Sequence, residues 1–142
     1  MKTQEELRNE AVQAEAEELI WMKKKIAAFL EQDFGKVLTS EGGIIDLNRL
    51  DCYFREHVFH LIWEHIDKNL LCPCATSTEE KKFYPGENLL PKKISDLFLE
   101  PLKEKGWIGR IYVMYSKYTN AEFGLYNLTS CNYFLEVMPL KK

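Results

Sequence analysis

The spacing of apolar residues changes along this chain, and that change limits the fold more than any other feature. Up to about residue 68, apolar residues recur every three or four positions, which is typical of amphipathic helices. From Trp107 onward, β-branched and aromatic residues dominate, as strands prefer. Helices followed by strands predict an α+β fold, in which the helices pack against one face of an antiparallel sheet.

The first expected helix begins after Thr3 and ends near Phe34. Thr3 followed by Glu6 is a capping-box pattern, and Gly35 is expected to end the helix in a left-handed conformation. Apolar residues form one stripe along this helix: Val12, Leu19, Met22, Ile26 and Phe29. The stripe predicts packing of the helix on its own domain, and a homodimer through this helix is the alternative.

A second, central helix is expected from an N-cap at Asp46 to about Lys68. Its main buried face comprises six positions: Leu47, Leu50, Phe54, Val58, Leu61 and His65. A second apolar face comprises four more: Cys52, Phe59, Trp63 and Ile66. Because a helix that is apolar on two faces is usually covered on both sides, this helix is expected to be buried.

A loop-like linker is expected between the helical half and the sheet, from about residue 69 to residue 91. It contains the turn signal Pro85-Gly86. A short helix is expected after it, at about 92–105, where Pro101 predicts a kink or a break. Gly106 is expected to end this helix.

Three antiparallel strands are expected in the last part of the chain. The first starts at Trp107, and the others lie near 122–128 and 132–138, with Ser130 in the link between them. Short links predict a meander of three strands.

The length of 142 residues predicts a single domain that covers the whole chain. Its expected parts are a helical half at about 3–68, a linker at about 69–91, and a short helix with the sheet at about 92–138.

Composition disfavours several classes of function. The net charge of −3 is mild, and no segment has the basic excess that is typical of nucleic-acid-binding proteins. No uncharged stretch approaches the roughly 18 apolar residues that a membrane span needs, so no membrane association is expected. The first residues are polar, unlike those of a signal peptide, so we expect a cytoplasmic protein whose four cysteines are reduced.

All three histidines lie within nine residues of the second expected helix. His57, His60 and Glu64 are spaced i, i+3 and i+7, which places them on one stripe of a helix. Two imidazoles and a carboxylate can bind a divalent metal, so a metal-binding domain or a metal-dependent enzyme is one alternative. The spacing is not the i, i+4 pattern of zincins, and a polar stripe between two apolar faces is the simpler interpretation. No metal or cofactor is therefore assigned.

No pattern for nucleophilic or redox catalysis is present. Cys72-Pro73-Cys74 lacks the two intervening residues of the thioredoxin motif, and there is no nucleophile elbow or Gly-rich phosphate loop. His65 lies on the apolar face and is interpreted as a core residue. No catalytic residue is assigned, and a non-enzymatic function is expected.

A second alternative is a binder of single-stranded nucleic acid. In the strand from Trp107, alternate residues point to opposite faces, and one face carries Arg110, Tyr112 and Tyr118. Aromatic side chains beside an arginine on an open sheet can stack on bases. The mild charge disfavours this interpretation.

Protein binding is the favoured function. Trp21, Tyr112 and Tyr118 are assigned as partner-binding residues, because exposed Trp and Tyr side chains often anchor protein interfaces. The chain is predicted to be a non-enzymatic protein-binding module: an inhibitor, an immunity-type protein or an adaptor. It would bind another protein through these aromatics and a mildly acidic helical surface.

Overall fold

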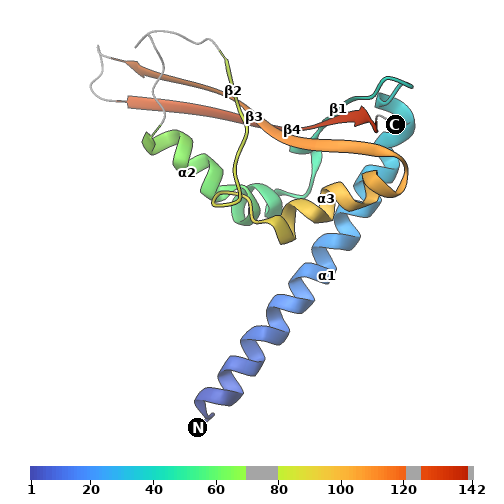
Figure 1. Ribbon diagram of the computed structural model, residues 1–142. Coiled ribbons are helices and arrows are strands. Elements are labelled where there is room, and N and C mark those ends of the chain that lie inside the picture. Colours follow the sequence, from blue (N-terminus) through green and yellow to red (C-terminus); the bar gives the residue numbers. More distant parts are fainter. Residues whose placement is uncertain (70–79, 121–125, 141–142) are drawn as a thin grey trace.

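The computed structural model describes residues 1–69, 80–120 and 126–140, and it has an α+β fold (Figure 1). The elements in chain order are α1 (Gln4–Val37), β1 (Gly43–Asp46), η1 (Leu47–Arg49), η2 (Phe54–Val58), α2 (His60–Asn69), β2 (Lys81–Phe83), α3 (Lys92–Glu104), β3 (Trp107–Asn120) and β4 (Tyr126–Pro139). The predicted fold class is confirmed, because a long N-terminal helix and further helices accompany an antiparallel sheet. That sheet has four strands in the order β1-β4-β3-β2, one more than predicted.

Two long strands, β3 and β4, form the centre of the sheet. They pair from Trp107 opposite Pro139 to Asn120 opposite Tyr126. Ser130, predicted to lie in a link, is paired with Ser116 inside this ladder, so β4 is one strand where two were predicted. No Gly or Pro interrupts the sequence around Ser130, so nothing local ends the strand there. Residues 121–125, which include the start of the predicted second strand, lie outside the described residues.

The two edge strands are short and were not predicted. β1 pairs with β4, placing Ile45 opposite Leu135, and β2 pairs with β3, placing Phe83 opposite Val113. Strands of four and three residues are too short to show an alternating pattern in the sequence. A turn precedes β1, in which Gly42 exchanges two backbone hydrogen bonds of 3.0 Å with Thr39.

The predicted central helix is replaced by three short helical segments. Asp46 caps the first of them, η1, because its carboxylate accepts a hydrogen bond of 2.8 Å from the backbone N–H of Asn48. The second, η2, is a π-helical turn, in which the N–H of Phe59 donates to the carbonyl of Phe54, five residues earlier, at 2.8 Å. Such a turn inserts one extra residue relative to an α-helix.

The π-helical turn moves the buried face by one position. Predicted core residues up to Phe54, the first residue of the turn, are covered. Beyond the turn, Leu61 is 50% exposed and His65 is only partly buried. Their places in the core are taken by Ile62 and Ile66, which are fully buried. A continuous helical period across residues 47–68 was therefore the wrong assumption. The second predicted face is also only half buried. Phe59 and Ile66 are buried, whereas Cys52 and Trp63 are exposed.

The first helix begins as predicted and ends later. The side chain of Thr3 accepts a hydrogen bond of 3.1 Å from the N–H of Glu6, which confirms the N-cap. Gly35 lies inside α1, so the predicted end near Phe34 was wrong. The last turns are held by the rest of the protein, because the buried carboxylate of Asp33 accepts a hydrogen bond of 3.3 Å from Arg49.

The third helix, α3, is continuous from Lys92 to Glu104 with Pro101 inside it, so the break that Pro101 predicted is not found. Gly106 follows with a φ of 86° and ends the helix as predicted. α3 lies close to β3 at Gly109, where a Cβ atom would come within 2.4 Å of Leu102 Cδ1. Glycine at this position lets the helix pack tightly against the sheet.

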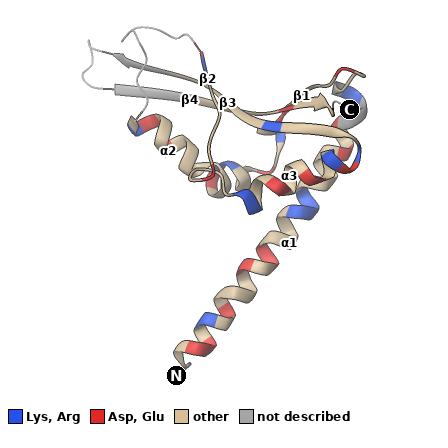
Figure 2. Cartoon of the chain, in the orientation of Figure 1, with Lys and Arg blue, Asp and Glu red and all other residues tan. Residues whose placement is uncertain are grey.

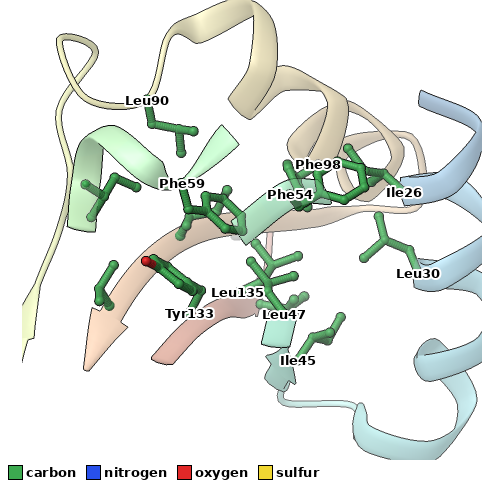
Figure 3. Packing of buried hydrophobic residues seen from close by; sticks show 14 of the residues in the cluster. Ile26, Leu30, Ile45, Leu47, Phe54, Phe59, Leu90, Phe98, Tyr133 and Leu135 are labelled. Atoms are coloured by element: carbon green, nitrogen blue, oxygen red, sulfur yellow. The ribbon is translucent and has the colours of Figure 1, made fainter. Parts of the chain in front are cut away.

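The core lies between one face of the sheet and the helices that cover it (Figures 1 and 3). The largest fully buried side chains come from most elements: Ile26, Leu30, Ile45, Leu47, Phe54, Phe59, Ile62, Ile66, Phe98, Leu102, Tyr133 and Leu135. Aromatic rings form its centre, where Phe59 stacks on Tyr133 with ring centroids 4.6 Å apart.

Candidate functional site

The N-terminal half of α1 projects from the body of the protein (Figure 1). Residues 4–18 are exposed at every position, and we name this part of α1 the arm. Its exposed residues include two large apolar ones, Leu7 at 53% and Val12 at 62%. Close to its base, Glu15 pairs with Lys93 of α3, and the hydrogen bond from Lys93 lowers the pKa of this glutamate. The predicted stripe is therefore covered only beyond this point: Met22 and Ile26 are buried, and Leu19 and Phe29 are partly covered.

Negative charge predominates on the arm (Figure 2). Residues 4–18 contain six glutamates and one arginine. Glutamates in the first turns favour helix formation, because they interact with the positive end of the helix dipole. The acidic helical surface that the sequence predicts is thus concentrated on a part of α1 that extends into solvent.

Trp21, a predicted partner-binding residue, lies where the arm joins the body. Its ring stacks on Phe54 with centroids 6.0 Å apart and meets the edge of Tyr53 at 4.9 Å. The side chain is still 37% exposed. Trp21 therefore attaches α1 to the body and also presents apolar surface beside the arm.

Tyr112, the second predicted partner-binding residue, is only 5% exposed, so the expected exposure was wrong. The ammonium of Lys82, in the unpredicted strand β2, lies 4.2 Å from the centroid of its ring. Rings of Tyr84 and Phe134 lie 5.8 and 5.5 Å away. The side chain of Tyr118, the third predicted residue, lies outside the described part of the structure.

The sheet face that could have stacked bases is occupied by contacts of its own. Arg110 lies 3.7 Å above the ring of Tyr84, whose hydroxyl donates to Glu136 at 3.5 Å. Lys82 is 3.9 Å from the same carboxylate. The rings and cations that would stack on bases and bind phosphates are thus engaged with one another and with Glu136, so this arrangement does not favour nucleic acid.

The histidines and Glu64 do not form one cluster. His60 Nε2 lies 2.9 Å from Glu64 Oε1. His57 lies within the π-helical turn, and its ring contacts that of Tyr53 at a tilt, with centroids 4.6 Å apart. His65 is partly buried and stacks on Phe83 at 5.4 Å, close to its predicted core role. Within residues 1–69, 80–120 and 126–140, no three metal-ligating side chains gather at one point. Cys72 and Cys74 lie outside these ranges.

A cleft that the sequence did not predict lies between the helical segments and β4. It has a volume of about 420 Å³ and is lined by Arg55, Glu56, His60, Trp63, Cys131 and Tyr133. A smaller hollow of about 140 Å³ shares Arg55 and Tyr133 with it. Strand alternation does place Cys131 and Tyr133 on one face, but no sequence signal brings that face to residues 55–63. We name this feature the Tyr133 cleft.

The thiol in this cleft is in its neutral form at pH 7. Burial raises the pKa of Cys131 to about 11, and the charge of Asp67 adds to this effect, whereas a hydrogen bond with Tyr133 opposes it. Burial also raises the pKa of Tyr133. Because only the thiolate is a strong nucleophile, the cleft suits binding rather than cysteine catalysis.

Cys131 should be alkylated far more slowly in the folded protein than in urea at pH 7.5. A pKa raised from 9.0 to about 11 leaves about a hundredfold less thiolate. The rate in the folded state should then rise about tenfold per pH unit up to about pH 11. Peptide mapping after timed treatment with iodoacetamide measures this, with the exposed Cys52 as a control that reacts in both states. Equal rates for Cys131 in the two states would contradict the assignment.

None of the helices in the described residues is long and apolar enough to cross a membrane. Comparison with known protein families, with curated proteins and with solved structures gave no match for this chain.

Proposed function

We propose that this chain is a non-enzymatic protein-binding module and that the arm is its docking element. One observation supports this most: fifteen consecutive residues form a regular helix and are all exposed. A helical segment of about that length is only marginally stable in water by itself. Covering the exposed apolar side chains of the arm, such as Leu7, with a partner would bury apolar surface and stabilise the helix.

The arm has a face suited to a partner helix. Leu7, Ala14 and Trp21 are spaced by seven residues, and Ala11 lies between the first two. Residues seven apart lie nearly in line on a helix, so these side chains form a narrow apolar seam. The exposed part of Trp21 would be the largest contact on this seam, in line with its predicted role.

The charge of the arm defines the partner further. Six glutamates against one arginine favour a protein that presents a basic helix or groove. Opposite charges would speed the encounter and make it sensitive to salt. An inhibitor, an immunity-type protein and an adaptor all act by such masking or bridging, and they are the classes that we propose.

Charge reversal on the arm should abolish partner capture. The immobilised full-length chain is compared with the triple variant Glu5→Lys, Glu6→Lys and Glu10→Lys, using extract of the source cells and quantitative mass spectrometry. We expect a partner whose recovery falls about tenfold or more with the variant, because opposite charges become like charges. The same partner should elute as salt is raised.

A matched control carries the same charge change elsewhere, at the exposed residues Glu41, Glu87 and Glu104. It should retain the partner. Identical sets of captured proteins from all three chains would contradict docking through the arm.

A further inference from the structure

The Tyr133 cleft has the size of a small-molecule site. Its volume of about 420 Å³ falls in the range of about 300–1,000 Å³ that is usual for ligand pockets. Apolar walls with few polar groups are also usual there, because the walls supply affinity and the polar groups fix orientation. In this cleft the walls include the Trp63 ring, which is 39% exposed, and the polar groups come from Arg55, Glu56, His60 and Tyr133.

The hydroxyl of Tyr133 has no nitrogen or oxygen hydrogen-bond partner in the described part of the chain. The residue is 1% exposed, and its oxygen makes no hydrogen bond of ordinary geometry within the described part of the chain. Figure 3 shows the ring packed beside Phe59, with its oxygen pointing away from Leu47 and Leu135. The nearby Cys131 thiol is a weak partner for a hydroxyl. Since a phenylalanine ring would fill the core equally well, the hydroxyl marks a place where a ligand atom can bind.

Arg55 provides a cation for the same place. It lines both the cleft and the adjoining hollow with Tyr133. It has no ion pair with a described residue, in contrast to Arg49, which pairs with Asp33. His60, which also lines the cleft, is already paired with Glu64 at 2.9 Å. A guanidinium and a hydroxyl that both donate match the two oxygens of a carboxylate.

We propose that the Tyr133 cleft binds a small organic carboxylate with an aromatic body. The guanidinium of Arg55 pairs with the carboxylate, the hydroxyl of Tyr133 donates to it, and the ring of Trp63 packs on the aromatic part. Glu56 also lines the cleft, so a second negative group on the ligand would be repelled. The ligand is therefore a monocarboxylate.

The test is a titration of the full-length ¹⁵N-labelled protein, followed through the indole N–H signals of its three tryptophans. The probes are benzoate, phenylacetate, indole-3-acetate and 1-naphthylacetate, together with the amide of each. The Trp63 signal, identified with Trp63→Phe, should shift and saturate with at least one carboxylate, while Trp21 and Trp107 stay in place. The affinity for the matching amide should be lower by a factor of about ten or more, because the amide cannot form the ion pair.

Two variants and one control locate the contacts. Arg55→Gln and Tyr133→Phe should each weaken binding of the best carboxylate by about tenfold or more. Arg110→Gln, which removes an exposed arginine on the other sheet face, should leave binding unchanged. Tyr133→Phe should also keep or raise the melting temperature, because it removes a buried hydroxyl that meets only a weakly bonding thiol in place of a nitrogen or oxygen partner.

Three results would overturn the proposal. They are the absence of a saturable Trp63 shift with all four carboxylates, equal affinity for acid and amide, and a lower melting temperature for Tyr133→Phe. The last result would show that the hydroxyl bonds within the protein. A pentapeptide that ends in phenylalanine serves as a further probe, and its binding in the absence of binding by the free carboxylates would assign the cleft to peptide C-termini instead.

Discussion

Replacing Phe59 with alanine should lower the free energy of unfolding by about 3–5 kcal/mol. Phe59 follows the π-helical turn and is 1% exposed. Its ring stacks on Tyr133 at 4.6 Å and contacts Phe98 at 6.3 Å, so the substitution leaves a cavity between three elements. Chemical denaturation of the full-length chain measures the change as a shift in midpoint at constant slope.

Leu61→Ala is the matched control, two residues further along. A continuous helix would bury Leu61, but the π-helical turn leaves it half exposed. Its substitution should change stability by no more than about 0.5 kcal/mol. If Leu61→Ala lowered the free energy of unfolding as much as Phe59→Ala does, the buried face would have the register of an uninterrupted helix.

Gly42→Ala should destabilise the protein by about 2–5 kcal/mol. Gly42 has a φ of 103°, which disfavours any residue with a Cβ atom. A Cβ at this position would also lie 2.1 Å from the backbone oxygen of Val137, so β1 would have to move away from β4. Thermal or chemical unfolding of the variant measures both effects together.

Gly106→Ala separates the two contributions. Gly106 has a φ of 86° but no atom within 4 Å of the position of a Cβ. Gly106→Ala should therefore lower the free energy of unfolding only by the cost of the left-handed backbone conformation, about 1–2 kcal/mol. If Gly42→Ala cost no more than Gly106→Ala, the close approach of the turn to β4 would be contradicted.

Features set by neighbouring residues were predictable from the sequence. The N-cap at Thr3, the cap at Asp46 and the end of α3 at Gly106 depend on side chains or glycines within a few positions. The two faces of β3 also follow from local alternation, because Ile111 and Val113 lie in the core. The α+β class followed from the same local periods.

Features set by tertiary contacts were not predictable. The π-helical turn at Phe54 has no sequence signature, and one inserted residue moves every later position on the helix. α1 continues through Gly35 because buried contacts of Leu30 and Asp33 hold its last turns. β1 and β2 form because the long strands offer edges with which they can pair.

The candidate sites, too, were predictable only where they depend on neighbouring residues. Exposure of the acidic arm could be anticipated in part, because its glutamates are visible in the sequence, whereas its separation from the body could not. Tyr112 was expected at the surface, but the unpredicted strand β2 brings Lys82 over its ring. The Tyr133 cleft joins residues 55–63 to residues 131–133, and a single sequence gives no information on such a distant pairing.

The most direct test of the account is photo-cross-linking in the source cells, with a benzophenone amino acid at Ala14, an exposed position on the apolar seam, of the full-length chain. The control carries the same group at the exposed Lys103 of α3. We expect an adduct with one protein from position 14 only, which disappears when Glu5, Glu6 and Glu10 are changed to lysine. An adduct of twice the mass of the chain would identify the partner as a second copy. Cross-linking that is equal at the two positions, or absent from both, would contradict the proposal that the arm binds a protein.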